Sequence, residues 1–125
     1  MARLTEGRYV VVSEEFTMIC RFWRGWTTRE NAAVYEALLR GTVIPGIEAR
    51  SIYGFRHIDM MRRDLQDEVE FATIMWFDDL DAVKAFVGAD HEAAHVPAAA
   101  AAVLSRFDER VTHYDVFERR QQKAE

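Results

Sequence analysis

The chain has 125 residues, of which half are hydrophobic and 30% are charged, and its formal net charge is −5. This length fits a single domain with its own core, and the apolar fraction excludes an intrinsically disordered chain. Because phosphate recognition needs a basic surface, the excess of 21 acidic over 16 basic residues predicts no nucleic-acid partner.

The sequence also indicates where the protein works. No stretch approaches the roughly 18 apolar residues that a membrane-spanning helix needs, so we expect no membrane partner. Residues 1–16 contain no apolar segment of signal-peptide length. The single cysteine, Cys20, cannot form an intramolecular disulfide, and we therefore expect a cytoplasmic protein.

The first clearly patterned element of the chain is a predicted strand. We interpret residues 1–16 as an N-terminal extension, although residues 8–12 resemble a short strand. Residues 17–26 predict the first strand of the domain, because they are rich in β-branched and aromatic side chains. Both faces of this strand carry apolar groups, which indicates contacts on both sides.

A helix is expected directly after this strand. Thr27 and Glu30 have the spacing of a capping box, in which each side chain satisfies a backbone N–H of the other. Helical spacing of apolar residues continues to about Arg40 and resumes through residues 44–47. Pro45 in that second piece is compatible only with a new helix start or a kink.

A hairpin and a second helix come next. Residues 53–63 and 68–77 have strand-like composition and are joined by a short polar turn, which predicts a hairpin. The pair Asp78 and Asp79 supplies an N-cap for a helix with an apolar stripe. Gly88 is placed to end that helix.

The last third of the chain predicts short helices and a final strand. Asp90 can cap a short helix that begins at His91, and Pro97 can open an alanine-rich helical segment. Residues 109–117 alternate as a strand, and residues 118–125 form a polar tail.

This order of elements indicates an α+β fold of the ferredoxin-like, split βαβ type, with the domain over residues 17–117. Helices would cover one face of a four-stranded antiparallel sheet. The other face would expose apolar side chains, and pairing two such faces would give a homodimer with a barrel-like centre. The side chains expected on that second face are Trp23, Ile58, Met60 and Ile74.

Three segments resemble the antibiotic biosynthesis monooxygenase-like family of dimeric α+β barrels. They are MICRFWRGWT at residues 18–27, TIMWF at 73–77 and LDAVKAF at 80–86. For the enzymes of that family, the resemblance implies oxygenation of a small aromatic, polyketide-like or quinol substrate with no cofactor. The protein then supplies a base, a donor for the developing oxyanion and a dry pocket.

The haem-degrading branch of the same fold is less well matched. It uses an Asn on the first strand, with a Trp and a His on the helix after the third strand. Here the first strand has no Asn, Phe86 stands where the Trp would be, and only His95 is near its expected position.

The segment HEAAH at residues 91–95 matches the H-E-x-x-H zinc motif. On a helix this spacing puts two imidazoles one turn apart, with a glutamate able to activate water. Pro97 follows closely, no G-x-x-H extends the motif, and the short helix offers little room for a substrate cleft. We therefore expect no metal, and keep a zinc hydrolase built on His91, Glu92 and His95 as an alternative.

Three histidines are candidates for a catalytic base, because an imidazole titrates near neutral pH. His95 lies near a predicted helix end, while His57 and His113 lie on predicted strands, which hold side chains firmly in place. The structural alternative, which we favour for each of them, is a hydrogen bond at a helix end or across the sheet, or exposure to solvent.

Four further residues are candidates for binding the substrate. Arg24 offers a donor fork for an enolate or carboxylate, and Trp26 on the same strand face offers an aromatic wall. Trp76 and Phe86 are candidates for the same wall. The structural alternatives are that Arg24 pairs with an acidic residue and that the aromatic residues belong to the core or to a dimer interface.

Two other functions on this fold stay open beside the oxygenase. One is a non-catalytic, dimeric protein that binds a small ligand, favoured if the pocket lacks an acid–base pair. The other is a lactone isomerase-type enzyme, which would need a histidine beside an acid in the cavity, with His57 or His113 as candidates.

Overall fold

The computed structural model describes residues 2–5, 8–11 and 17–123. Strand β1 (Ala2–Thr5) pairs antiparallel with β2 (Arg8–Val11), and the two form a separate small sheet. Strand β2 coincides with the strand-like pattern at residues 8–12, whose last residue lies outside the described part of the chain.

The main sheet is antiparallel and has the predicted ferredoxin-like topology. Its strands lie in the order β4, β5, β3, and both β6 and β7 pair with the outer side of β3. The strand predicted at residues 109–117 is present as the shorter β7, and β6 is an additional short strand before the predicted range. The bounds are Ile19–Thr27 for β3, Phe55–Asp64 for β4, Val69–Phe77 for β5, Arg106–Phe107 for β6 and Thr112–Asp115 for β7.

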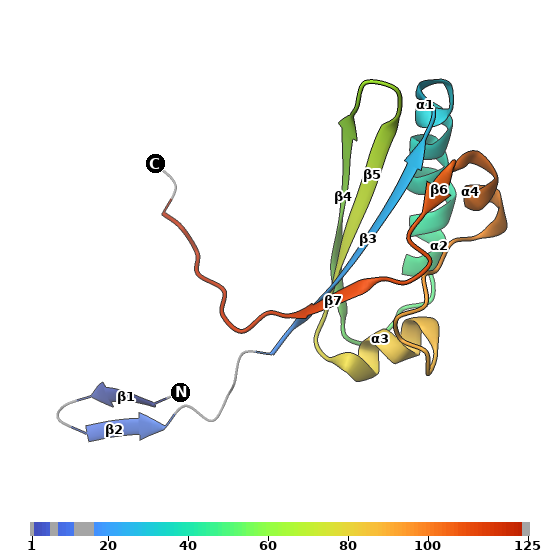
Figure 1. Cartoon of the computed structure of the whole chain (residues 1–125). Helices are drawn as coiled ribbons and strands as arrows, with labels where there is room; N and C mark the ends of the chain where they lie inside the picture. The colour runs from blue at the N-terminus through green and yellow to red at the C-terminus, as the bar shows by residue number, and fades with distance from the viewer. Residues whose placement is uncertain (1, 6–7, 12–16, 124–125) are drawn as a thin grey trace.

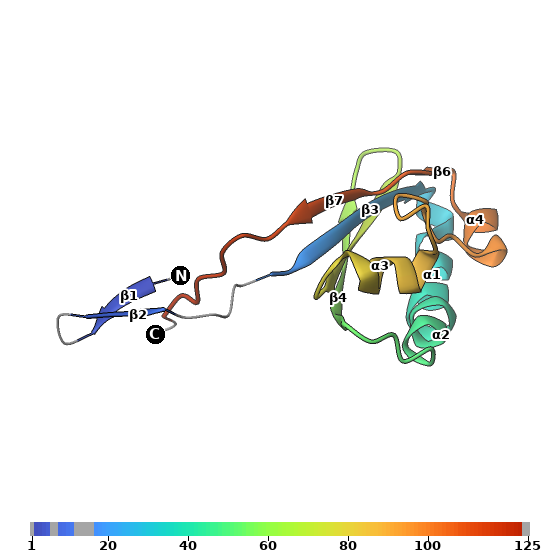
Figure 2. The same cartoon turned by 90° about the horizontal axis from the view of Figure 1, so that it is seen from below.

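The helices lie on one side of this sheet, as Figures 1 and 2 show from two directions. None of the described helices is long and apolar enough to cross a bilayer. Their bounds are Arg29–Leu38 for α1, Leu39–Val43 for the π-helix η1, Ile44–Glu48 for α2, Leu80–Val87 for α3 and Ala98–Val103 for α4.

Most helix ends agree with the sequence signals. The side chain of Asp79 caps α3 by accepting from the backbone N–H of Ala82, and Gly88 ends that helix with φ 95°. Pro97 precedes α4 as its N-cap residue, as expected for a residue without an N–H. Pro45 lies in the first turn of α2, where its missing N–H leaves no hydrogen bond unmade.

The predicted capping box at Thr27 is wrong by one residue. Thr28 is the N-cap of α1, and its side chain accepts from the backbone N–H of Asn31. Thr27 is instead the last, fully buried residue of β3, where its hydroxyl donates to the carbonyl of Val103. Sheet pairing therefore extends one residue beyond the predicted strand end.

The helix predicted from His91 is also wrong. Ala93 forms an isolated antiparallel bridge with Arg110, and the N–H of Ala94 donates to the carbonyl of Glu109. Residues 91 and 92 thus form a turn, and residues 93 and 94 pair with the stretch between β6 and β7, more than ten residues away in sequence. A local N-cap signal at Asp90 could not reveal this competing, non-local pairing.

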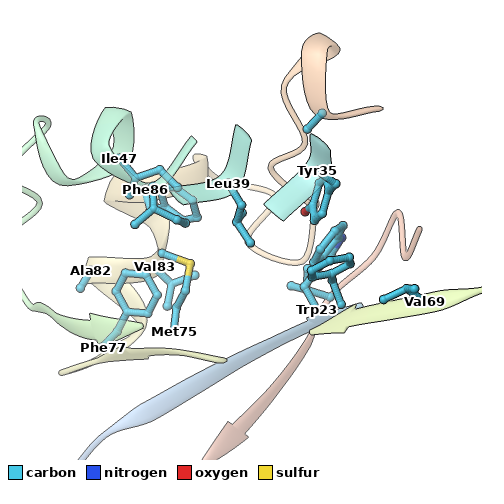
Figure 3. Close-up of a cluster of buried hydrophobic side chains, with 14 of the residues drawn as sticks. Trp23, Tyr35, Leu39, Ile47, Val69, Met75, Phe77, Ala82, Val83 and Phe86 are labelled. Atoms are coloured by element: carbon cyan, nitrogen blue, oxygen red, sulfur yellow. The ribbon is translucent and has the colours of Figure 1, made fainter. Parts of the chain in front are cut away.

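The core lies between the sheet and the helices. Figure 3 shows Trp23 and Met75 of the sheet beside Tyr35, Leu39 and Phe86 of the helices. The sequence placed Trp23 and Ile58 on the open face, and both in fact face the helices and line a cavity there. Met60 lines a separate hollow beside α1. Ile74 lies on the open face as expected, because it alternates with the buried Thr73 and Met75 and pairs with Phe22 across the sheet.

Candidate functional site

A cavity of about 50 Å³ lies between the helix-facing side of the sheet and the helices. Its walls are mostly apolar, which is typical of small-molecule sites. This volume has room for a few water molecules but not for an aromatic ring, so a ring must reach it through an opening in the wall. On the sheet side the cavity is lined by Arg21, Trp23, Ile58, Thr73 and Met75.

A wider hollow of about 220 Å³ adjoins the cavity. Four residues line both spaces, so the two are separated by no more than these side chains, and we call this hollow the mouth. One side of the mouth is formed by η1 and α2, and the other by the segment that leads into α4. The shared residues are Val43, Ile47, His95 and Pro97.

The wall next to the mouth contains the π-helix η1, from which Leu39 and Val43 line the cavity. A π-helical turn is rare, and such turns often occur at functional sites where the wall of a pocket must adjust. Gly41 lies on the solvent-exposed side of this turn, where a side chain would meet nothing within 4 Å.

Arg21 is the most unusual residue of the cavity, because it is a charged side chain that is only 3% exposed. Its Nη1 donates to the carbonyl of His91 at 2.7 Å, and its Nη2 donates to the carbonyl of Ala93. These two bonds hold the 91–95 segment against the sheet. The residue thus builds one wall of the cavity as well as lining it.

The charge of Arg21 has no carboxylate partner among the described residues; its acceptors are two carbonyls and the Nε2 of His113 at 3.2 Å. Burial lowers the pKa of Arg21 to about 10, so the guanidinium is still cationic at neutral pH. A buried cation without a counter-ion is costly, which makes this position favourable for an anionic or oxyanionic ligand.

His113 lies beside Arg21 in the sheet, since the two residues are cross-strand neighbours. Burial lowers the pKa of His113 to about 4, and the charge of Arg21 contributes to the same shift. A neutral His113 that accepts from Arg21 through Nε2 carries its proton on Nδ1, and Nδ1 is buried without a partner. The residue therefore supports Arg21 and does not itself line the cavity.

His95 lies at the junction between the cavity and its mouth, with its ring 5.1 Å from the ring of Phe86. Desolvation of the imidazole lowers its pKa below the usual range, and the charges of Arg50 and Arg21 add to this effect. His95 is thus neutral at neutral pH and able to accept a proton. Among the three predicted candidate bases, it is the one that lines the cavity.

Phe86 is the aromatic wall of the cavity. Its ring lies 5.4 Å from the guanidinium carbons of both Arg21 and Arg50, within the range of a cation–π contact. Of the four predicted substrate-binding residues, Phe86 is the one that the structure places beside His95.

The other three predicted binding residues lie on the opposite, open face of the sheet. Arg24 forms a salt bridge with Asp108 at 3.3 Å, which is the structural alternative considered for it. Trp26 lies on the same face, stacked under the guanidinium of Arg106. Trp76 also lies there and donates through its indole N–H to Asp59.

His57 lies on the open face too, 5.4 Å from the ring of Trp76. A register shift between Phe55 and His57 explains this placement, because one extra residue reverses the alternation of side chains along β4. Phe55 accordingly packs inward against Phe77, although residues two positions apart on a regular strand would share a face.

The histidines of the HEAAH segment do not form the zinc motif. Because the segment is a turn followed by a β-bridge and not a helix, His91 and His95 are not one helical turn apart on a shared face. Within the described residues, no group of three His, Cys, Asp or Glu side chains is arranged to hold a metal ion.

Sequence reasoning missed Arg21, although a signal was present. Arg21 alternates with Ile19, Trp23 and Gly25 on one strand face, and a charged residue within an apolar face is unusual enough to indicate function. The sequence did not show which face of this strand meets the helices, because both faces are apolar.

Neither a protein-family model nor a curated protein matches this sequence. Solved structures do match it. A candidate antibiotic biosynthesis monooxygenase from Bacillus cereus has a TM-score of 0.58 at 12% identity, and covers 85% of this chain and 99% of its own. SnoaB, a cofactor-independent oxygenase from Streptomyces nogalater, has a TM-score of 0.50 at 19% identity, over 84% of this chain and 96% of its own.

These similarities confirm the resemblance at the level of the fold. The chain has the α+β, ferredoxin-like fold of antibiotic biosynthesis monooxygenase-like proteins, and the matched region includes most of the described chain. Because a shared fold hosts many activities, the chemistry must be argued from the cavity itself.

Proposed function

We propose that this protein is a monooxygenase that needs no cofactor and acts on a small aromatic substrate of the quinol or polyketide type. The observation that carries the proposal is the cavity, which combines a buried cationic donor, Arg21, with a neutral imidazole, His95. The fold shared with SnoaB supports the same class of reaction.

In this proposal His95 is the base. Its position between the mouth and the cavity lets a hydroxyl group of the substrate approach the ring from either space. The lowered pKa keeps the imidazole unprotonated before the substrate binds, as a general base requires. Removal of the hydroxyl proton gives the electron-rich anion that reduces dioxygen.

Arg21 stabilises that anion. Its guanidinium is fixed by the carbonyls of His91 and Ala93, so it needs little rearrangement when negative charge develops on the substrate oxygen. The apolar walls around it exclude water, which strengthens the interaction. Tyr35 also lines the cavity, and burial raises its pKa to about 12, so it is a proton donor and not a base.

We further propose that the protein is a homodimer formed through the open face of the sheet. This face carries apolar residues that the helices leave uncovered, and a second copy would cover them. The residues concerned include Phe22, Trp26, Ile74, Trp76 and Tyr114, of which Tyr114 is 59% exposed in the single chain.

Oxygen uptake in the presence of a panel of quinols and hydroxylated polycyclic aromatics tests the activity. We expect His95→Ala to lower kcat/KM by about 100-fold or more, since a general base contributes at least that much. The matched control is His57→Ala, which removes an imidazole from the open face and should leave uptake within about twofold of the native rate.

Equal uptake by the native protein and His95→Ala would show that His95 is not the base. If the native protein binds these aromatics but consumes no oxygen with any of them, the oxygenase proposal fails. A non-catalytic ligand-binding protein would then be the better description of the same cavity.

A further inference from the structure

The cavity and its mouth are positively charged in a protein whose net charge is −5. Two arginines line these spaces, Arg21 in the cavity and Arg50 in the mouth. No Asp or Glu is among the residues that line either space. The concentration of positive charge is therefore local and opposite in sign to the molecule as a whole.

Both arginines differ from most arginines of the described chain, which have a carboxylate within salt-bridge distance. Neither Arg21 nor Arg50 forms such a salt bridge with any described residue. Most surface arginines are thus paired with a carboxylate, with Arg29 as an exception, whereas neither arginine of the cavity and mouth is paired in this way. The salt-bridged arginines are Arg24, Arg40, Arg56, Arg62, Arg63, Arg106, Arg110 and Arg120.

Arg50 is fixed at the mouth by the end of helix α3. Its Nη2 donates to the carbonyls of Ala85 and Phe86, at 3.1 and 2.9 Å, and its guanidinium lies against the ring of Phe86. Its Nη1 and Nε have no acceptor among the described residues, although a guanidinium carries N–H donors on all three nitrogens. These donors are free to bind a ligand in the mouth.

Phe86 connects the two charges. The guanidinium carbons of Arg21 and Arg50 each lie 5.4 Å from its ring centroid, and the His95 ring lies 5.1 Å away. Phe86 and Arg21 line the cavity, and Arg50 lines the mouth, so a ligand that spans both spaces meets one guanidinium in each.

Resting on the function proposed above, we infer that the substrate is an aromatic hydroxy acid. Its hydroxyl group points into the cavity toward Arg21 and His95, and its carboxylate is bound by Arg50 in the mouth. A carboxylate is favoured at Arg50 because the mouth is open to water, so its remaining lone pairs stay solvated. The smaller hydroxyl group suits the smaller space, the cavity of about 50 Å³.

Binding of 4-hydroxybenzoate and 4-hydroxybenzamide, measured by calorimetry on the native protein, tests the inference. The two probes have nearly the same shape and the same hydroxyl group, and differ in the charge of the group opposite it. We expect the carboxylate to bind about tenfold more tightly, as for a hydrogen bond to a charged group.

Three variants show whether Arg50 is the cause of this preference. Arg50→Gln should reduce the preference to within about twofold and leave the affinity for the amide unchanged, while Arg50→Lys should retain most of it. Arg40→Gln is the matched control, because Arg40 is an exposed arginine of η1 that lines neither the cavity nor the mouth. It should keep the full preference.

The inference is wrong if the amide binds as tightly as the carboxylate, if neither probe binds at about 1 mM, or if Arg50→Gln keeps the preference. Each of these outcomes leaves the proposed oxygenase activity untouched, because that activity is measured separately as oxygen uptake with uncharged quinols. Conversely, a strong preference without any oxygen uptake would support the acid-binding site in a non-catalytic protein.

Discussion

Two arginines three residues apart on strand β3 have opposite environments. Arg21 faces the helices, is 3% exposed and has only neutral acceptors, namely two backbone carbonyls and a histidine. Arg24 faces the open side of the sheet, and its exposed guanidinium pairs with Asp108. On one face of the strand the guanidinium has no counter-ion, which favours an anionic ligand there. On the other face it is neutralised by a salt bridge at the surface.

The comparison shows that the face of the strand on which a side chain lies, which alternates from one residue to the next, decides its role here. Successive side chains point to opposite faces, so one residue separates a cavity position from a surface position. The chemistry proposed for this protein lies entirely on the helix-facing side. The open side offers large aromatic side chains and paired charges, which suit an interface between two copies.

The strongest test of this difference between the two faces of the sheet compares substitutions at two neighbouring residues of β5. Met75 is 5% exposed on the helix-facing side, and Ile74 lies on the open side. Met75→Asp should leave the protein largely unfolded, because an unpaired carboxylate in the core costs a large part of the about 5–15 kcal/mol that stabilises a domain. Circular dichroism in increasing urea measures this loss.

Ile74→Asp, by contrast, should keep the native circular dichroism and turn the dimer into a monomer. Its carboxylate is solvated in the single chain and becomes buried only when two open faces meet. Light scattering at micromolar concentration reports the mass. A folded dimer for Ile74→Asp would contradict the proposed interface, and a fully stable Met75→Asp would contradict the assignment of the two faces.

A smaller effect is expected in the pH dependence of stability. The pKa of His113 is lowered to about 4 in the folded protein, while the unfolded chain has an ordinary value near about 6.5. Between these values the unfolded state binds a proton that the folded state does not. Stability from this group is therefore present above about pH 6.5 and is lost as the pH falls toward 4.

His113→Gln removes this proton uptake, so its urea midpoint should fall less than that of the native protein between about pH 6.5 and 5. His57→Gln is the control on the open face and should keep the native slope. Acidic residues affect the pH dependence of stability equally in all three proteins, so their effect cancels in the comparison. Identical slopes for the native protein and His113→Gln would show that His113 is not held neutral by its surroundings.

Much of the fold could be predicted from local sequence signals. The strand at 68–77, the caps at Asp79 and Gly88, and the helix after Pro97 each depend on a few adjacent residues, and the structure contains all of them. The order of these elements was then enough to indicate a split βαβ sheet.

The site was harder to predict because it depends on contacts between distant segments. The bridge from Ala93 to Arg110 replaces a locally favoured helix, and the register shift before His57 reverses the faces of β4. Both faces of β3 are apolar, so alternation alone gave no direction for Arg21 and Arg24. His95 and Phe86 were sequence candidates that line the cavity, whereas the placement of Arg21 required knowledge of which face the helices cover.

The central claim is that the reaction takes place on the helix-facing side of β3. Oxygen uptake by Arg21→Lys and Arg24→Lys, with the quinol that the native protein oxidises fastest, tests it most directly. Loss of the fixed guanidinium fork at Arg21 should lower kcat/KM by about 100-fold, and the same change at Arg24 should have an effect of less than about twofold. Circular dichroism checks that both variants are folded. Unchanged uptake by a folded Arg21→Lys, or a loss confined to Arg24→Lys, would contradict the account.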